Sequence, residues 1–413
     1  MTRPATSPLD RKLLAVLRSL LGQIPVALVL YDTENLPVTD SPIVGTVRMA
    51  DRSSLMSMAL NPEVGFGDAY SAGKVEMEGD LVASLEYVCR SSPRVRNWSW
   101  RMLSKWYDWA QANTRRGASR NIQHHYDLSN DFYRLWLDER MVYTCAYFPT
   151  PEASLDEAQE AKLDLVCRKL CLRPGETVVE VGCGWGALAI YMAQHYGVRV
   201  KAFNISHEQI VWAREWAKEV GVASRVEFVE DDYRNVSGQF DVFASVGMLE
   251  HVGRENYTEL GRVIHRAIGD TGRGFLHFIG RNRPQPFSVW TRKRIFPGAY
   301  CPSLRESMEV LEPQNYCVLD IENLRQHYAK TLEHWLARFE SEFDTVVQLH
   351  GVEFARMWRL YLAGSIASFR AGNLQLFQVL FAGSRCQSIP WTREHIYTSV
   401  REETDNEQWT RAM

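Results

Sequence analysis

The sequence predicts an α/β protein in which helices flank a parallel sheet and a small mixed domain precedes them. After residue 120, apolar strand-like runs alternate with amphipathic helical patterns, and a glycine-rich turn joins the first of these strands to the next helix. Parallel strands need crossover connections, so this alternation is typical of a parallel sheet. From Val26 to Val88, short apolar runs are instead interrupted by Gly, Pro, Asn and Asp.

The composition is that of an ordinary globular chain with room for two or three domains. Of its 413 residues 46% are hydrophobic and 23% charged, which excludes a disordered or collagen-like chain. The net charge of −3 argues against a globally basic nucleic-acid-binding protein. No segment has the roughly 20 clean apolar residues of a membrane span. The spacing of the eight cysteines suggests neither a zinc site nor a disulfide framework, so we expect a cytoplasmic chain with reduced thiols.

The N-terminal region begins with an expected amphipathic helix. Leucines recur at helical spacing from Leu9 to Leu21, and we expect this face to pack on a core, with a membrane-surface helix as the alternative. Two further short helices are expected at Ser54–Leu60 and Leu81–Cys89.

A basic and aromatic segment follows, from Arg90 to Arg120. It holds eight basic residues against one acid, or +7, with four Trp and one Tyr between them. Three interpretations fit it: a solvated linker helix, a docking surface for anionic lipid, or a nucleic-acid contact. A second basic stretch lies between Arg281 and Arg294.

The sequence predicts alternating helices and strands for the remainder of the chain. In order they are a helix at Ser154–Leu172, a strand at Thr177–Val181, a helix at Ala187–Tyr196, a strand at Val198–Phe203, a helix at Ser206–Val220, strands at Val226–Glu230 and Phe240–Ser245, a helix at Tyr257–Ala267 and a strand at Gly274–Ile279.

The glycine-rich turn indicates a nucleotide-like cofactor. Glycines at Gly182 and Gly184 let the backbone turn sharply and approach a ligand closely. With Ala187 they also satisfy G-x-G-x-x-A, so their spacing alone does not exclude a dinucleotide.

Two other features favour S-adenosylmethionine. Glu180, two residues before the first glycine, is placed to receive the ammonium of an amino-acid moiety. The next strand ends at Asn204, where a dinucleotide site normally has an acid for the ribose. Asp232 and Tyr233 follow the third strand, where adenine contacts are expected. The sequence therefore predicts a methyltransferase.

Several motifs, not all of them in this core, carry a closer resemblance. They are His125–Ser129, Met141–Phe148, Val181–Gly186, Ser245–Gly253, His277–Gly280, Ile295–Gly298, and Tyr328 followed by Thr331 and Leu332. Over roughly residues 120 to 385 the chain resembles the cyclopropane-fatty-acyl-phospholipid synthases, their mycolic-acid relatives and the related methylene- and methyl-branching enzymes. The resemblance implies a class I methyltransferase fold, Rossmann-like, with a seven-stranded sheet and helical insertions. It divides the chain into a lipid- or membrane-associated domain at 1–120 and a catalytic domain at 121–413.

The resemblance also assigns site residues. It implies that Tyr126, Tyr143 and Thr144 cover the cofactor, that Gly182 and Gly184 line it, and that Asn204, Ile205 and Gln209 meet its ribose or adenine side. A second set matches the family's pocket for a bicarbonate ion: Cys145, Glu250, His277, Ile279 and Tyr328. Thr144 stands where many members have Ser, and Leu249 where many have Phe.

The implied reaction is methyl transfer to the cis double bond of an unsaturated phospholipid acyl chain, through a carbocation. Proton loss from the added methyl closes a cyclopropane, the expected product. Proton loss from the chain gives a 10-methylene product, the alternative. A nucleic-acid or small-molecule methyltransferase and a lipid-binding module without activity remain the other classes. We expect a homodimer at the inner face of an anionic membrane, with no metal and no nucleic acid.

Overall fold

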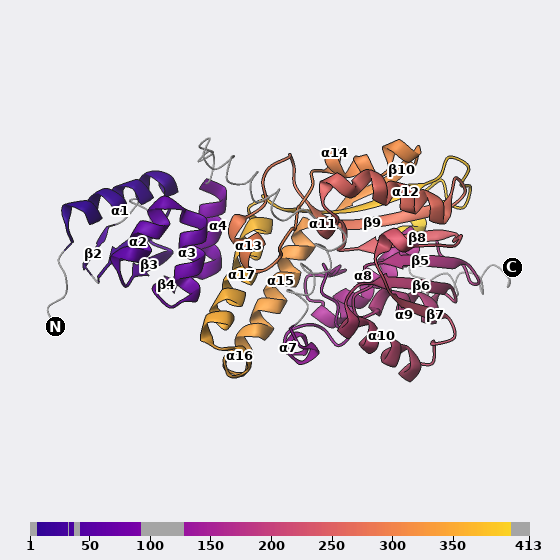
Figure 1. The fold of residues 1–413 in the computed structure, drawn as a ribbon, viewed down its shortest axis with the longest axis horizontal. Helices are drawn as coiled ribbons and strands as arrows, with labels where there is room; N and C mark the ends of the chain where they lie inside the picture. The colour runs from indigo at the N-terminus through magenta and orange to yellow at the C-terminus, as the bar shows by residue number, and fades with distance from the viewer. Residues whose placement is uncertain (1–5, 32, 37–41, 92–127, 398–413) are drawn as a thin grey trace. The chain divides into compact units, whose positions relative to one another are not determined.

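The computed structural model describes residues 6–31, 33–36, 42–91 and 128–397 (Figure 1). The chain divides into two compact units. The first comprises Met1–Leu137, Pro284–Tyr300 and Arg325–Gln375, and the second Asp138–Arg283, Cys301–Leu324 and Leu376–Met413. The predicted domain boundary at residue 120 and the segment 92–127 lie outside the described residues.

The first unit begins with a small sheet and four helices. The sheet has the order β2-β1-β3-β4, with β1 and β3 parallel and the outer two strands antiparallel to them. The elements are α1 (Pro8–Leu21), β1 (Val26–Leu30), β2 (Thr33–Leu36), β3 (Gly45–Met49), α2 (Arg52–Leu60), α3 (Pro62–Ser71), β4 (Val75–Gly79) and α4 (Leu81–Ser91). The expected core-packing face of α1 is confirmed, because Leu14 and Leu17 join the core beside Leu28 of β1.

The first unit has five more helices among the described residues, and all but the second of them carry members of an aromatic cluster. They are α7 (Asn130–Arg134), α13 (Val289–Arg294), α15 (Arg325–Ser341), α16 (Phe343–His350) and α17 (Val352–Arg370). The ring of Trp136 lies 5.6 Å from that of Trp335 and 5.8 Å from that of Trp358, and all three are buried. Much of the aromatic surplus of the sequence therefore serves packing.

The second basic stretch is largely committed to contacts within the first unit. Lys293 and Arg294 of α13 form ion pairs of 3.1 and 2.9 Å with Asp68 of α3. Arg292 is buried, and the indole of Trp290 occupies the space that a side chain at Gly67 would need. These contacts join α13 to α3, so the paired cations do not form an unpaired basic surface.

The second unit contains the expected seven-stranded sheet. Its order is β10-β11-β9-β8-β5-β6-β7, with β5 to β9 forming parallel pairs and β10 antiparallel to β11 (Figure 1). The strands are β5 (Thr177–Val181), β6 (Arg199–Asn204), β7 (Val226–Glu230), β8 (Val242–Val246), β9 (Arg273–Gly280), β10 (Cys317–Asn323) and β11 (Gln375–Ala382), the last beginning at the boundary between the units. The sequence analysis did not predict the antiparallel pair.

Four helices of the second unit agree with the predicted ones to within three residues. They are α8 (Leu155–Lys169), α9 (Ala187–His195), α10 (His207–Glu219) and α12 (Tyr257–Ile268). The short helices α11 (Leu249–Val252), α14 (Leu304–Ser307) and α18 (Glu394–Tyr397) were not predicted, nor were the 3₁₀ turns at Tyr233–Asn235, Arg254–Asn256, Met308–Val310 and Glu312–Gln314. Helix α8 starts with a capping box between Ser154 and Glu157, which satisfies two otherwise unpaired groups at its N-terminus.

Apolar side chains cover both faces of this sheet. Val178 of β5 packs with residues of α8, α9 and α10 on one face, whereas its neighbour Val179 packs with α12 on the other. This alternation is expected when successive residues of a strand point to opposite sides. None of the helices within the described ranges combines the length and apolar character needed to cross a membrane.

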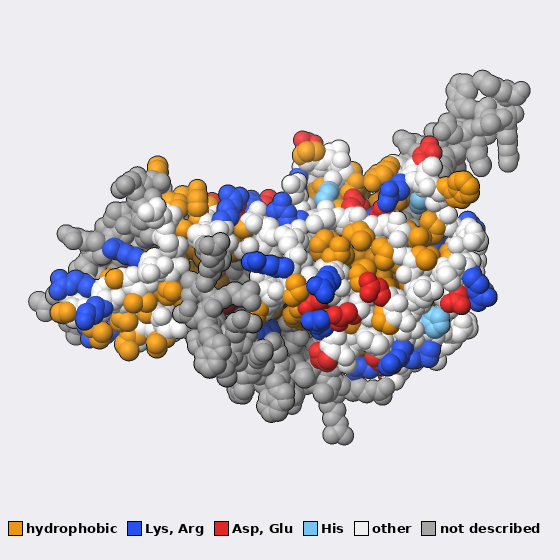
Figure 2. Space-filling view, turned by 90° about the horizontal axis from the view of Figure 1, so that it is seen from above, with side chains coloured by type: hydrophobic (Ala, Val, Ile, Leu, Met, Phe, Trp, Pro, Cys, Tyr) orange, Lys and Arg blue, Asp and Glu red, His pale blue; other side chains and the backbone are white. Residues whose placement is uncertain are grey.

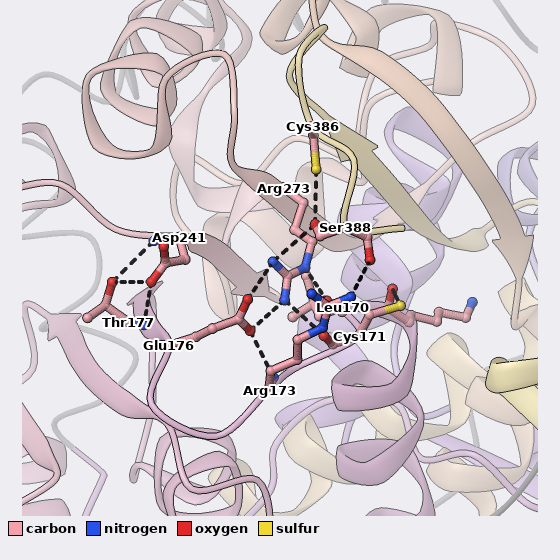
Figure 3. A network of polar contacts seen from close by, with 10 residues as sticks. Leu170, Cys171, Arg173, Glu176, Thr177, Asp241, Arg273, Cys386 and Ser388 are labelled. Carbon is pink, nitrogen blue, oxygen red and sulfur yellow. Dashed lines mark hydrogen bonds and ion pairs between the residues drawn. The ribbon is translucent and has the colours of Figure 1, made fainter. Parts of the chain in front are cut away.

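A polar network ties the N-terminal edge of the sheet together (Figure 3). The buried guanidinium of Arg273, at the start of β9, donates to both carboxylate oxygens of Glu176 at 3.0 and 2.6 Å. It also donates to the carbonyls of Leu170 and Cys171 and to Ser388 Oγ. One side chain thus connects the end of α8, the turn before β5 and the segment after β11.

Replacing Arg273 by Met should lower the free energy of unfolding by about 2–4 kcal/mol, because the carboxylate and both carbonyls lose a buried partner. Urea denaturation measures this loss. The matched control is Arg262→Met, which removes an exposed arginine from an ion pair with Glu259 and should cost less than about 1 kcal/mol. Equal losses in both variants would contradict the role given to Arg273.

Candidate functional site

The glycine turn follows β5 at the carboxyl edge of the sheet. Gly182, Gly184 and Gly186 have φ of +78°, +55° and +88°, values that side chains with a Cβ rarely adopt. A Cβ at Gly186 would lie 2.7 Å from the ring of Phe228. The N–H groups of Gly182 and Cys183 donate to Phe203 O at 2.8 and 3.2 Å, which fixes the turn to the end of β6.

Polar groups at the end of β6 join the same site. Asn204 Nδ2 donates to Gln209 Oε1 at 2.7 Å and to Gly184 O at 3.3 Å. The N–H of Ile205 donates to Asn204 Oδ1 at 2.9 Å. The structure therefore brings together Gly184, Asn204, Ile205 and Gln209, and their contact with a cofactor stays a prediction.

The residues after β7 are engaged with each other. Asp232 caps the short 3₁₀ turn at Tyr233–Asn235, and its carboxylate accepts from the N–H of Arg234 at 2.9 Å and pairs with the guanidinium at 3.1 Å. The guanidinium lies 5.0 Å from the centre of the Tyr233 ring. Asp232 and Tyr233 thus follow the third parallel strand in a structured turn, and their contact with adenine stays a prediction.

A buried lysine organises the loop that carries Thr144. Lys162 of α8 is 2% exposed and donates from Nζ to Thr144 Oγ1 at 2.9 Å. Burial lowers the pKa of Lys162 to about 8, while the nearby charges of Asp138, Cys145 and Glu180 oppose that decrease. Lys162 thus brings Thr144, Cys145 and Glu180 into one neighbourhood. Tyr143, beside Thr144, is partly buried.

Glu180 carries an unsatisfied oxygen. Its side chain is 2% exposed, and Oε2 makes no hydrogen bond within the described residues. Burial raises the pKa of Glu180 to about 8, although Lys162 and the N–H of Ala189 favour the ionised form. A buried carboxylate oxygen without a donor is costly, so it suits a ligand that brings a donor, such as the ammonium of an amino acid.

Two further buried atoms without hydrogen bonds lie near the carboxyl end of β9. Glu250 Oε1 accepts from the N–H of Ile279 at 2.5 Å, while Glu250 Oε2 is buried without a hydrogen bond in the described structure. His277 Nε2 is likewise buried and unsatisfied, and His277 Nδ1 lies 3.2 Å from Gln378 Nε2. His277 and Ile279 are two residues apart, so their side chains project from the same side of the strand.

The charges of these two groups are set by burial. It raises the pKa of Glu250 from 4.5 to about 7, with the Ile279 N–H opposing. Burial, together with the positive charges of Lys162 and Lys169, lowers the pKa of His277 well below 6.5. Near neutral pH the histidine is therefore uncharged and the glutamic acid is partly protonated.

The other predicted site residues are Cys145, Tyr328 and Tyr126. The thiol of Cys145 is buried and donates to Ala146 O at 3.1 Å, as expected for a packed thiol rather than a nucleophile. Tyr328 belongs to α15 of the first unit, where its ring lies 4.6 Å from that of Phe369 and 6.0 Å from that of Trp335. Tyr126 lies outside the described residues.

Three polar residues near these groups were missed by the sequence analysis: Lys162, Lys169 and Gln378. A signal for the lysines was available, because they are seven residues apart and fall on the apolar stripe of α8 with Leu155, Ala158 and Val166. Charged residues at such positions are rarely buried without a partner. Gln378 offered no comparable signal within its buried strand.

A seven-stranded sheet of this order, with a glycine turn after its first strand in the chain, defines an S-adenosylmethionine-dependent methyltransferase. The crystal structure of mycolic acid cyclopropane synthase CmaA1 complexed with SAH and CTAB agrees with this class. It superposes with a TM-score of 0.61 at 31% identity, covering 64% of this chain and 97% of that one.

Residues 113–379 match the mycolic acid cyclopropane synthetase family, and the chain belongs to this family. A probable fatty acid methyltransferase of Pseudomonas putida is 33% identical over 386 residues, which cover 91% of this chain and 96% of the relative. The cyclopropane-fatty-acyl-phospholipid synthase of Escherichia coli K12 is 39% identical over 259 residues, 62% of this chain and 66% of the relative.

Glu250 should destabilise the folded protein at alkaline pH. Its pKa is about 7 in the folded chain and 4.5 in the unfolded chain. Ionising it therefore lowers the free energy of unfolding progressively from pH 4.5 to pH 7 and fully above pH 7, and has no effect below pH 4.5. At pH 8 we expect Glu250→Gln to raise the free energy of unfolding by about 1–3 kcal/mol, and by much less at pH 5.

Urea denaturation at the two pH values measures this difference. Glu219→Gln, an exposed change on α10, is the control and should alter stability little at either pH. A Glu250→Gln protein that is less stable than wild type at pH 8 would show that the carboxylate serves the fold.

Proposed function

We propose that the protein transfers a methyl group from S-adenosylmethionine to the cis double bond of an unsaturated phospholipid acyl chain and forms a cyclopropane ring. The family supports the coarser statement, methylation of lipid acyl chains that uses S-adenosylmethionine. The observation that carries the proposed removal of a proton by a small bound base is the pair of buried, unsatisfied atoms Glu250 Oε2 and His277 Nε2. They suit a small polar ion better than an acyl chain.

The proposed ion is bicarbonate, and the chemistry of the donors fits it. A neutral His277 offers an N–H donor when its proton is on Nε2, and a protonated Glu250 offers an O–H donor. Bicarbonate would supply a base, and S-adenosylmethionine the methyl group. Holding the base through hydrogen bonds keeps it beside the reacting carbon without placing a strong nucleophile of the protein there.

The same residues limit capture of a carbocation. Burial keeps Glu250 partly protonated near neutral pH, and a neutral acid is a poor nucleophile. The Cys145 thiol donates to a carbonyl, which favours its protonated form. A carbocation would therefore lose a proton to the small base more readily than it would alkylate a side chain of the protein.

For the methyl donor, the proposed contacts are those at the carboxyl edge of β5 and β6. Glu180 would accept from the ammonium, Gly182 and Gly184 would allow close approach, and Asn204, with Ile205 and Gln209, would meet the ribose or adenine side. Tyr143 and Thr144 would cover the donor, with Thr144 oriented by Lys162. The resemblance adds Tyr126, Asp232 and Tyr233 to these expected contacts, and it assigns Cys145, Ile279 and Tyr328 to the expected bicarbonate pocket. Positioning of this kind supplies much of the rate when the nucleophile is a weak alkene.

A second product remains in view. Loss of a proton from the chain instead of the added methyl would give a 10-methylene acyl chain, a precursor of methyl-branched lipids. The relative that matches over most of the chain carries the name of a probable fatty acid methyltransferase, a name that does not distinguish the two products.

The proposed substrate requires access to a membrane surface. On α1, Leu9 and Val16 are exposed beside Arg11 and Lys12, and Leu60 of α2 is 79% exposed. Figure 2 shows hydrophobic and basic side chains interspersed on this N-terminal part. Such a surface suits peripheral contact with anionic lipid. The homodimer implied by the resemblance and the cytoplasmic location expected from the cysteines stay predictions.

Labelled S-adenosylmethionine incubated with vesicles of mono-unsaturated phospholipid should yield a labelled acyl chain that is one methylene unit heavier. Mass spectrometry before and after catalytic hydrogenation distinguishes the products, because a cyclopropane resists hydrogen uptake and a methylene group does not. Product that takes up hydrogen would establish the alternative, and unlabelled lipid would contradict both.

Glu250→Gln should lower the turnover number about 10²–10⁴-fold, because the proposed base loses one of the groups that hold it, while binding of S-adenosylmethionine changes little. Removing bicarbonate from the buffer should slow the wild-type enzyme and hardly affect the variant. The comparison is Glu255→Gln, an exposed change five residues away, which should retain both the activity and the bicarbonate response. A wild-type rate that ignores bicarbonate would exclude this ion as the base.

A further inference from the structure

The imidazole of His277 is connected to a buried lysine through one glutamine. Gln378 of β11 is fully buried, and its Nε2 lies 3.2 Å from His277 Nδ1. Gln378 Oε1 accepts from Lys169 Nζ at 2.8 Å. The three residues come from β9, β11 and α8, and all belong to the second unit.

We propose that Lys169 and Gln378 are positioning residues that hold His277 in the tautomer with its proton on Nε2, so that the histidine presents an N–H donor to the site. The biological use of that donor rests on the proposed function, whereas the tautomer itself does not.

Donor and acceptor chemistry determines this tautomer of His277. A lysine ammonium only donates, so the oxygen of the Gln378 amide must face Lys169. The NH₂ of the same amide must then face His277, and His277 Nδ1 must accept. A neutral imidazole carries one N–H, which leaves the proton on Nε2. The orientation of the amide is thus dictated by the lysine and does not depend on how its oxygen and nitrogen are assigned.

The side-chain nitrogen of Lys169 also contacts two acids. The side chain of Lys169 is 1% exposed, and Nζ lies 2.5 Å from Glu322 Oε2 and 3.7 Å from Asp320 Oδ2, both on β10. Two carboxylates beside one buried ammonium offset the cost of its burial. The antiparallel pair β10–β11 therefore carries both the acids that hold the lysine and the amide that contacts the histidine.

The tautomer determines what the site can bind. His277 Nε2 is buried and has no hydrogen-bond partner among the described residues. With a proton there, it attracts an oxyanion such as the proposed bicarbonate. With the proton on Nδ1, Nε2 would present a lone pair and repel the same ion. A change of one buried amide should therefore reverse the role of the histidine.

The decisive variant is Gln378→Glu, which keeps the size of the side chain but replaces the NH₂ donor with an acceptor. Its carboxylate can accept from Lys169 and from His277 Nδ1–H together, so the proton should move to Nδ1. Nitrogen-15 NMR of histidine-labelled protein distinguishes the two tautomers, and the His277→Asn variant identifies the signal. We expect the Nε2–H pattern in wild type, the Nδ1–H pattern in Gln378→Glu, and a mixture in Lys169→Met.

Gln375→Glu is the matched control, because Gln375 is also buried on β11 and donates to Gly372 O. It should keep the Nε2–H pattern. In the lipid assay, Gln378→Glu should lose about 10–100-fold in activity, as outer-shell changes commonly do, and Gln375→Glu should not.

An Nδ1–H pattern in the wild-type protein would overturn the proposal without any variant, and so would an Nε2–H pattern in Gln378→Glu. The NMR measurement needs neither lipid nor S-adenosylmethionine. A failure of the proposed lipid reaction would therefore leave the assignment of the tautomer standing, and the two proposals fail separately.

Discussion

Helix α8 buries two lysines, Lys162 and Lys169, against one face of the sheet, and polar groups of the candidate site lie around them. A buried ammonium is tolerated only when other groups replace its water. Lys162 obtains these partners from the loop that holds Thr144 and from the neighbouring acids, and Lys169 obtains them from β10 and β11. Satisfying two charges therefore fixes the loop before α8, the side chain of Glu180 and the far edge of the sheet relative to one helix.

The same region leaves other polar atoms unsatisfied. Glu180 Oε2, Glu250 Oε2 and His277 Nε2 are buried without hydrogen bonds in the described structure. All three lie near the carboxyl ends of parallel strands, where ligands bind in sheets of this kind, so they are candidate ligand contacts. The fully satisfied network of Arg273 at the opposite edge shows what a purely structural arrangement looks like in this protein.

The fold of the protein accounts for its cofactor, whereas the residues of the site determine the methyl acceptor. The seven-stranded sheet and glycine turn account for use of S-adenosylmethionine, and many unrelated methyl acceptors are served by such folds. For the proposed alkene chemistry, the relevant observations are a neutral histidine, a partly protonated acid and a packed thiol. These groups can hold a base through hydrogen bonds, and none of them is a strong nucleophile in that state.

Local sequence signals determined a large part of this structure. Strand–helix alternation placed β5 to β9 within two residues, and glycine at positions of positive φ located the turn, because both depend on neighbours in the chain. The motif residues Glu250 and His277 were also recognisable. Only the tertiary structure decided what they contact. Lys169 and Gln378 are separated by 209 residues, and Asp68 meets Arg294 across 226. No local pattern encodes such pairs, because a buried charge selects its partners only after the elements that carry them have packed.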